Sequence, residues 1–447
     1  MIKKNKKALL FGFLSTVTAS ILMVSNAQAD NVYDTRQEND TSKLQAYLKF
    51  TKIVKIIEEQ YVDELNTSDI IDKALKGMLV NLDAHSSFMN AKESKDLQVQ
   101  TNGEFGGLGI SVGMRDGALT VIAPIEGTPA DKAGMKSKDI ILKIDDQATI
   151  GMTIDKAVSL MRGKPGTPIK LTVIRKGESK PLTIDIVRDI IEIQSVYAKT
   201  IGDDILYLRI TSFDQKVVSS MKESIAKHPE AKGFVIDLRN NPGGLLNQAI
   251  GVVDMFVDHG VIVSQKGKVA SENLIYNARP DNSDTQTPIV ILVNDGSASA
   301  SEIVSGALQD HKRAVIVGKK TFGKGSVQIV MPIGNRESLR LTIARYYLPS
   351  GRTIQAVGVT PDIEVAYGEI KKADEGISIK ERDLQLHLES ELEKVDGVKI
   401  DKKGEENKTI ITEEQIYKDA QLKSAVDILK ALMISKRGTN DKEMLSE

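Results

Sequence analysis

The feature that most constrains the fold is an alternation of short apolar runs with helical patterns from about residue 190 onward. The apolar runs span residues 205–210, 234–238, 289–293 and 314–317, and the helical patterns between them span 217–226, 245–257 and 299–310. A later strand is predicted over residues 338–344. Strands separated by helices in this way predict a parallel βαβ sheet with right-handed crossovers. Functional groups are expected where strands meet helices, which singles out the loops at 239–244 and 294–301.

The second of these loops is rich in serine. Residues 296–302 are Gly-Ser-Ala-Ser-Ala-Ser-Glu, and a serine at such a turn has its oxygen near helix N-terminal amides that favour negative charge. Lys324, between two glycines, can act as the base for a serine nucleophile if burial lowers the lysine pKa. Taken singly, a serine here is more commonly a helix cap, and a lysine is more commonly a solvated charge. The Gly-Lys-Gly sequence also lacks the Walker spacing of a phosphate-binding loop.

The stretch from residue 294 to 328 resembles the core motif of the C-terminal processing peptidases, also called tail-specific proteases, which are Ser/Lys enzymes. The resemblance implies that Ser299 is the nucleophile, that Lys324 is the general base and that Gln328 orients Lys324. From the residues alone, Gln328 would be an ordinary polar strand residue. The family likeness extends over about residues 45–365 and implies a protease core of the crotonase/ClpP-like type.

The loop at 239–244, Arg-Asn-Asn-Pro-Gly-Gly, carries two glycines between a strand and a helix. Glycines permit positive φ and expose backbone N–H groups, although a simple βα turn needs only one of them. The same string occurs in the family, where a glycine amide of this loop helps to hold the oxyanion. The resemblance therefore implies an oxyanion hole made by Gly243 or Gly244 together with Ala300, and leaves open which glycine contributes.

Histidine is the obvious competitor as base, and the chain has five. His311 ends the helix that Ser299 begins, and a helix of about 12 residues rises roughly 18 Å, which places it far from Ser299. Neither a Gly-x-Ser-x-Gly elbow nor a His-Glu-x-x-His zinc motif occurs. The lysine mechanism is therefore favoured by exclusion as well, and no metal or organic cofactor is expected.

Residues 96–188 contain five or six short strand patterns and two helical patterns, and they resemble a PDZ domain. PDZ domains bind an extended peptide C-terminus by strand addition, with backbone N–H groups capturing the carboxylate. The resemblance assigns this capture to Leu108, Gly109 and Ile110; the alternative is a β-turn without a ligand. Arg162, at the end of the second helix, is by default a solvated surface charge. We also consider the hypothesis that it couples occupancy of the groove to the protease core.

The first 29 residues predict an export signal. Four lysines precede an apolar run of about 17 residues, which is at the lower limit for spanning a membrane, and an Ala-x-Ala site follows. Cleavage after Ala29 is favoured over an uncleaved membrane anchor. The absence of cysteine fits an exported protein. The expected location is a bacterial periplasm or cell envelope, associated with the inner membrane if the segment is retained.

The chain therefore predicts an α/β and α+β multidomain protein: a signal peptide (1–29), an N-terminal helical region (30–95), a PDZ domain that is β-sandwich-like with two helices (96–188), a Ser/Lys protease core (189–365) and a C-terminal helical region (366–447). Helical patterns at 379–395 and 412–435 form the tail. The apolar face of the second pattern (Leu422, Ala425, Val426, Leu429 and Leu432) must be buried, either on the core or in a homo-oligomer.

The predicted function is a serine endopeptidase that engages protein substrates by their free C-termini, with an adaptor or activator protein as a further expected partner. A formal net charge of -1, from 60 basic and 61 acidic residues, argues against nucleic acid as a partner. The alternative function is a catalytically inert PDZ scaffold or adaptor.

Overall fold

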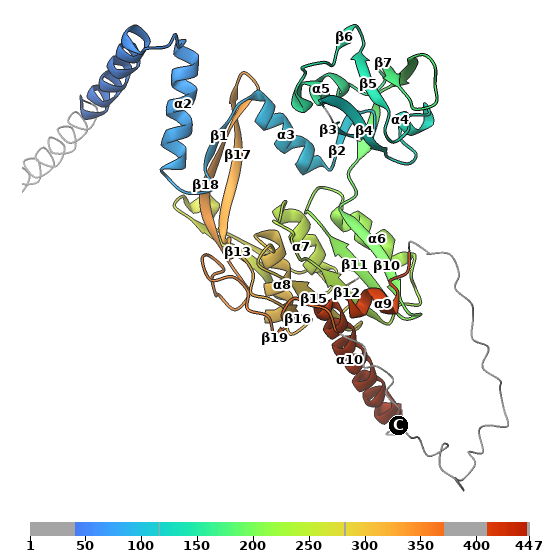
Figure 1. The fold of residues 1–447 in the computed structure, drawn as a ribbon. Coiled ribbons are helices and arrows are strands. Elements are labelled where there is room, and N and C mark those ends of the chain that lie inside the picture. Colours follow the sequence, from blue (N-terminus) through green and yellow to red (C-terminus); the bar gives the residue numbers. More distant parts are fainter. Residues whose placement is uncertain (1–40, 116, 281–282, 371–408, 445–447) are drawn as a thin grey trace, which may run out of the picture. The chain divides into compact units, whose positions relative to one another are not determined.

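The computed structural model describes residues 41–115, 117–280, 283–370 and 409–444 (Figure 1), and the chain divides into two compact units with the boundary after Phe88. The first unit contains a helix over residues 41–60 and helix α2 (Thr67–Val80). Asn66 caps α2 by accepting a hydrogen bond from the Asp69 N–H at 2.8 Å. This part of the chain is helical, as predicted. The proposed signal segment, 1–29, lies outside the described residues.

The second unit begins with strand β1 (Ser87–Met89), which spans the division, helix α3 (Ala91–Asn102) and strand β2 (Glu104–Gly107). An antiparallel sheet follows in the order β3-β4-β5-β7-β8, with β6 on β5. Its elements are β3 (Ile110–Arg115), β4 (Ala118–Pro124), α4 (Pro129–Lys132), β5 (Ile140–Ile144), β6 (Gln147–Ala148), α5 (Ile154–Met161), β7 (Pro168–Ile174) and β8 (Leu182–Val187). Six strands and two helices agree with the predicted domain. Strand β9 (Asp189–Glu192) then returns to pair with β2.

A six-stranded sheet of order β10-β11-β12-β15-β16-β19 forms the centre of the following region. Its strands are β10 (Val196–Ile201), β11 (Ile205–Ile210), β12 (Gly233–Asp237), β15 (Ile289–Val293), β16 (Val315–Gly318) and β19 (Ile363–Glu364). From β11 to β19 every pairing is parallel, as the strand–helix alternation predicts, whereas β10 runs antiparallel to β11. The crossover helices are α6 (Val217–Ala226), α7 (Leu246–Asp254) and α8 (Ala300–Asp310).

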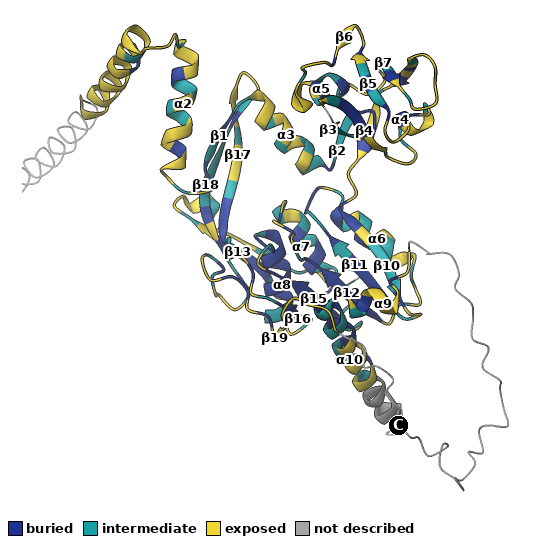
Figure 2. Ribbon diagram, viewed as in Figure 1, coloured by how far each residue is buried: buried dark blue, intermediate teal, exposed yellow. Residues whose placement is uncertain are grey.

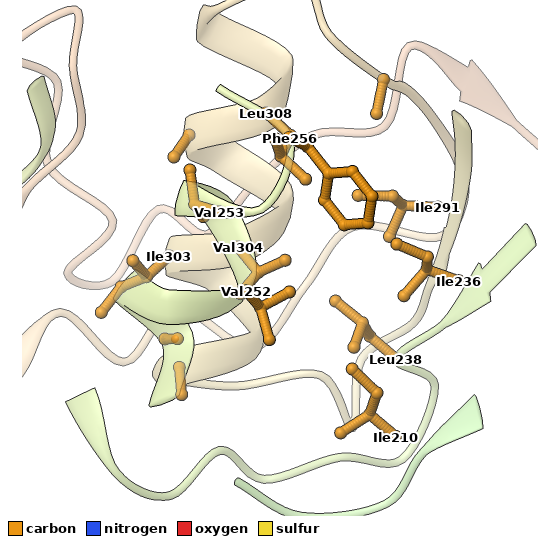
Figure 3. Close-up of a cluster of buried hydrophobic side chains, with 14 of the residues drawn as sticks. Ile210, Ile236, Leu238, Val252, Val253, Phe256, Ile291, Ile303, Val304 and Leu308 are labelled. Carbon is orange, nitrogen blue, oxygen red and sulfur yellow. The ribbon is translucent and has the colours of Figure 1, made fainter. Parts of the chain in front are cut away.

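Both faces of this sheet are buried, which explains the unbroken apolar sequence of β15. Alternate residues point to opposite faces of a strand, so Ile289, Ile291 and Val293 belong to one core cluster and Val290 and Leu292 to another. The first cluster packs the sheet against α7 and α8, and Figure 3 shows the ring of Phe256, which follows α7, beside Ile236 and Ile291 of the strands.

The second face is covered by the C-terminal helices, α9 (Glu413–Tyr417) and α10 (Ala420–Met444). Leu422, Ala425, Val426 and Leu429 are buried against the sheet, and Leu432 is partly buried there (Figure 2). The apolar face that could have served oligomerisation is thus used within the chain, and it gives no support to a homo-oligomer. The helical pattern predicted at 379–395 lies outside the described residues.

An antiparallel sheet unexpected from the sequence adjoins this core. Strands β13 (Val261–Gly267), β14 (Leu274–Asn277), β17 (Ser326–Gly334) and β18 (Glu337–Tyr347) pair as β14-β13-β18-β17. The short helix η1 (Ala270–Glu272) links β13 to β14. Only the strand expected at 338–344, now part of β18, was predicted here. The sheet matters for the site because Gln328 lies in β17, just after the loop that carries Lys324.

Candidate active site

Ser299 occupies a strained turn between β15 and α8. Its backbone angles are φ 55° and ψ -110°, outside the regions that a non-glycine residue ordinarily adopts. Such strain costs of order 1–3 kcal/mol and persists only where the surroundings enforce it. The side chain is half-buried, while Ala298 and Ala300 beside it are buried. The turn therefore presents the hydroxyl at the N-terminus of α8, as the sequence predicts.

The two loops singled out by the sequence are bonded to each other. The side chain of Asn294 accepts the Asn240 N–H at 2.8 Å and donates to Asn240 Oδ1 at 2.9 Å. The carbonyl of Asn241 accepts both the Ala298 N–H, at 3.0 Å, and the Ser301 hydroxyl, at 2.9 Å. These hydrogen bonds bring the glycine loop alongside the serine turn.

Both glycines of this loop have positive φ, 102° at Gly243 and 148° at Gly244, and neither position leaves room for a Cβ atom. A Cβ on Gly243 would lie 2.8 Å from the Ala298 carbonyl oxygen and 3.0 Å from the Ala300 nitrogen. The Gly243 N–H donates to Asn241 Oδ1 at 2.9 Å, whereas among the described residues the Gly244 N–H has no hydrogen-bond partner. Of the two amides that the sequence left open, Gly244 is the one not already engaged.

Glu302, which the sequence analysis did not single out, joins the serine turn to the lysine loop. Its carboxylate is fully buried and accepts four hydrogen bonds. The donors are the N–H groups of Ser299 (2.8 Å), Gly323 (2.7 Å) and Lys324 (2.8 Å) and the Thr321 hydroxyl (2.5 Å). The spacing Ser-x-x-Glu at a helix start is that of a capping box, and this pattern could have revealed the residue.

Lys324 is half-buried, and its pKa is lowered from the ordinary lysine value. Burial is the main cause, the positive charge of Arg340 adds to it, and the negative charge of Glu302 opposes it. This is the direction that a lysine base needs. Within the described residues no hydrogen bond joins Ser299 Oγ to Lys324 Nζ.

Ser299, Lys324, Gln328, Gly243 and Gly244 line one cavity of about 910 Å³. Helix α3 contributes Ser94, Leu97, Gln98 and Thr101 to its wall. Gln328 Nε2 donates to Ser326 Oγ at 2.8 Å and to Thr342 Oγ1 at 3.3 Å. Neither of these bonds is the contact with Lys324 that the resemblance implies. The cavity therefore gathers five of the predicted residues, but not Ala300, and Gln328 is bonded to hydroxyls of its own sheet.

The loop predicted to capture a carboxylate lies between β2 and β3. The carbonyls of Leu108 and Gly109 accept the N–H groups of Ala130 and Ile125, at 2.9 and 2.8 Å. In the part of the chain that the structure describes, the N–H groups of Leu108 and Gly109 have no such partner. Gly109 has φ 76°, and a Cβ there would lie 2.3 Å from Thr128 Cβ. Ile110 begins β3, which packs beside helix α5.

Arg162 is not the solvated charge that its sequence position suggests by default. Its guanidinium pairs with Asp96 of α3 at 3.1 Å and lies 4.8 Å from the centre of the Phe105 ring. The side chain is 29% exposed. Arg162 thus connects the end of α5 to α3, the helix that lines the cavity.

The histidine competitor is placed where the sequence predicts. His311 is the C-cap of α8, at the opposite end from Ser299, and its Nε2 lies 2.8 Å from the Val261 carbonyl oxygen. Among the described residues, no three or more His, Asp or Glu side chains are grouped so that they could hold a metal ion. No helix in the described ranges is long and apolar enough to cross a membrane.

Comparison with known proteins identifies the family. Residues 204–365 match the model of peptidase family S41, residues 106–186 match a PDZ domain, and residues 10–93 match the N-terminal domain described for the activating protease CtpB. The carboxy-terminal-processing protease of Bartonella bacilliformis is 44% identical over 392 residues, covering 86% of this chain and 89% of that protein. This chain belongs to the carboxy-terminal processing proteases of family S41.

Two further carboxy-terminal processing proteases are also similar to this chain. CtpA of Bacillus subtilis is 31% identical over 374 residues, covering 83% of this chain and 79% of that protein. The solved structure of a photosystem II D1 C-terminal processing protease is 27% identical, with a TM-score of 0.40, over 71% of this chain and 92% of the other. Family membership makes this protein a serine-type peptidase with a PDZ domain.

Proposed function

We propose that the protein is an endopeptidase in which Ser299 and Lys324 form a catalytic dyad. The observation that carries the proposal is the shared carboxylate of Glu302, which binds the N–H groups of both residues at the wall of one cavity. The neutral Lys324 amine takes the Ser299 proton as the hydroxyl oxygen bonds to the peptide carbonyl carbon. The resulting ammonium then protonates the leaving amine as the C–N bond breaks. Water hydrolyses the acyl-enzyme by the same route.

The oxyanion of this reaction is assigned to the N–H groups of Gly244 and Ala300. Gly244 is favoured over Gly243 because the Gly243 N–H already bonds to Asn241 Oδ1. Ala300 is the first residue of α8, where backbone N–H groups lack partners within the helix and favour negative charge. We assign Gln328 a role in orienting Lys324 when substrate is bound, which requires it to exchange one of its present hydroxyl partners.

Substrates are proposed to be exported proteins held by their C-terminal tails. Leu108, Gly109 and Ile110 would bind the terminal carboxylate. Support comes from the N–H groups of Leu108 and Gly109, which have no hydrogen-bond partner among the described residues. Arg162 is proposed to couple peptide binding in the PDZ groove to the protease core, because it donates a hydrogen bond to Asp96 of α3, the helix that lines the catalytic cavity. Export is supported by the lysine-rich start and apolar run of residues 1–29, and an adaptor or activator stays a proposed partner.

The test is cleavage of a reporter protein with an apolar C-terminal tail, compared with the same reporter ending in an amide. Wild-type protein is expected to cleave the free-acid reporter, to cleave the amide much more slowly, and to lose cleavage of both on Ser299→Ala. If the reporter binds to the PDZ domain and stays intact with wild-type protein, the inert scaffold is favoured.

A further inference from the structure

The start of the glycine loop is held by the C-terminal segment. Arg239, the first residue of the loop, donates from Nη1 to Asp419 Oδ1 at 3.0 Å and lies 2.8 Å from Asp419 Oδ2 through Nη2. Nη1 also donates to Gln421 Oε1 at 3.1 Å, and Gln421 is fully buried. Asp419 immediately precedes α10 and lies beyond residues 204–365, which match the peptidase family model.

The other edge of the Arg239 guanidinium is fixed by β12. Asp237 is fully buried and accepts Arg239 Nε at 3.0 Å and Nη2 at 2.7 Å. The Tyr207 hydroxyl donates to the same carboxylate at 2.7 Å. Burial by itself would lower the pKa of Arg239, but its bonds to Asp237 and then Asp419 raise the pKa above the ordinary value. The guanidinium is thus a charged bridge between the central sheet and the C-terminal segment.

Arg239 directly precedes the two asparagines that bond the glycine loop to the serine turn. Asn240, the next residue, has φ 55° and bonds to Asn294 of the serine turn, and Asn241 accepts from Ala298 and Ser301. A second contact from the C-terminal side reaches the same turn, where the Tyr367 hydroxyl donates to Asp295 at 3.0 Å. A shift of Arg239 would therefore be passed along a short, bonded path to Gly244.

We propose that Asp419 is a positioning residue for the oxyanion-binding loop, acting through Arg239. The inference rests on the proposed function, since it concerns the same reaction. Asp419 touches neither the cavity nor the reacting atoms, so its loss should lower kcat and leave KM and peptide binding by the PDZ domain nearly unchanged. Since losing one oxyanion donor outright costs about 10²–10³ in rate, displacing it through Asp419 is expected to cost about 10-fold.

Asp419→Asn and Asp419→Ser separate the effect of the Arg239–Asp419 ion pair on kcat from the effect of helix capping, since both variants remove the charge. Asp419 Oδ1 accepts the N–H groups of Gln421 and Leu422 at 3.1 Å each, and Asn or Ser retains such a cap. Asp419→Glu retains the charge and is expected to restore part of kcat. The matched control is Asp427→Asn on the same helix, which removes an exposed pair with Lys423 and should leave kcat unchanged.

The experiment measures kcat and KM of the full chain on the apolar-tailed reporter, tail binding by anisotropy, and Tm for each variant. A kcat lowered about 10-fold in both capping variants, with KM and tail binding retained and partial rescue by Asp419→Glu, supports the inference. Wild-type kcat in folded Asp419→Asn overturns it, as does a loss of kcat that disappears when rates are normalised to folded protein. Absence of cleavage by wild-type protein would instead overturn the proposed function.

Discussion

The buried carboxylate of Glu302 accepts the N–H of Lys324 at 2.8 Å, and it accepts the N–H of Ser299 at the same distance. The proposed nucleophile and base, 25 positions apart (324 − 299), therefore share one anchor. The anchor acts on the backbones of the two residues and leaves both side chains directed to their common cavity. Replacing this one group should disturb geometry and charge together.

Glu302→Gln should lower activity and shift its pH dependence. The Glu302 charge raises the Lys324 pKa, so its removal lowers that pKa further and moves the acid limb of kcat/KM to lower pH. Gln also replaces an acceptor oxygen by a donor facing N–H groups, and an unsatisfied buried group costs about 1–3 kcal/mol. A pH profile together with a denaturant titration separates the two effects. A limb that moves to higher pH would show that the Glu302 charge does not raise the Lys324 pKa.

Lys324→Met should make the fold more stable near neutral pH. Because the folded pKa of Lys324 is lowered, the unfolded chain binds more protons between the folded and unfolded pKa values, and wild-type stability rises with pH across that window. At pH values below the folded pKa, Lys324 is charged, and the loss of water around its ammonium group destabilises the fold. Met carries no charge and therefore avoids this cost. Tm of both proteins measured from pH 7 to pH 11 should converge as pH rises. A lower Tm for Lys324→Met at pH 7 would oppose the assignment.

Gly244→Ala should reduce activity by about 10²–10³, the usual cost of losing an oxyanion donor. The added Cβ would lie 2.3 Å from the Phe213 carbonyl oxygen, at a residue with φ 148°. The matched control is Gly166→Ala, where φ is also positive, at 83°, but no atom lies within 4 Å. Both variants should show some loss of stability in thermal unfolding, and only Gly244→Ala should lose kcat. Equal kcat in the two variants would argue against Gly244.

Arg175→Ala should destabilise the PDZ domain by about 3–5 kcal/mol, because it leaves the buried Asp139 carboxylate without its partner. Arg175 donates to Asp139 at 2.8 and 2.7 Å. Burial alone would raise the pKa of Asp139, but its bonds to Arg175 and Lys136 lower it below 3.8. The pair therefore stabilises the domain above pH 3.8 and loses its effect as pH falls through the folded pKa. Urea titrations at pH 7 and pH 3 should show a smaller difference between wild type and variant at the lower pH.

Much of the fold was predictable because local pattern and tertiary environment agree. Strands β11 and β15 and helix α6 have the predicted bounds, since unbroken apolar runs suit a doubly covered sheet. The antiparallel sheet of β13, β14, β17 and β18 was missed except for part of β18. Its register depends on pairing between residues far apart in the chain, such as Ser264 with Tyr347, which no local pattern specifies.

The same contrast holds for the site. Ser299, Lys324 and the two glycines were found because their motif resembles a known family, and the structure gathers them in one cavity. Glu302 and Asp419 were missed because each looks like an ordinary charged residue at a helix start. Their importance appears only in long-range bonds, which join residue 302 to 324 and residue 419 to 239.

The pH dependence of kcat/KM for wild-type protein and Lys324→Ala shows whether Lys324 acts as a neutral base toward Ser299. Wild-type kcat/KM should rise with pH along a limb whose midpoint lies below 10.5, and kcat/KM of Lys324→Ala should be lower by about 10³-fold or more and lack this limb. A Lys324→Ala protein that cleaves at the wild-type rate with the same pH profile would show that Lys324 is not the base.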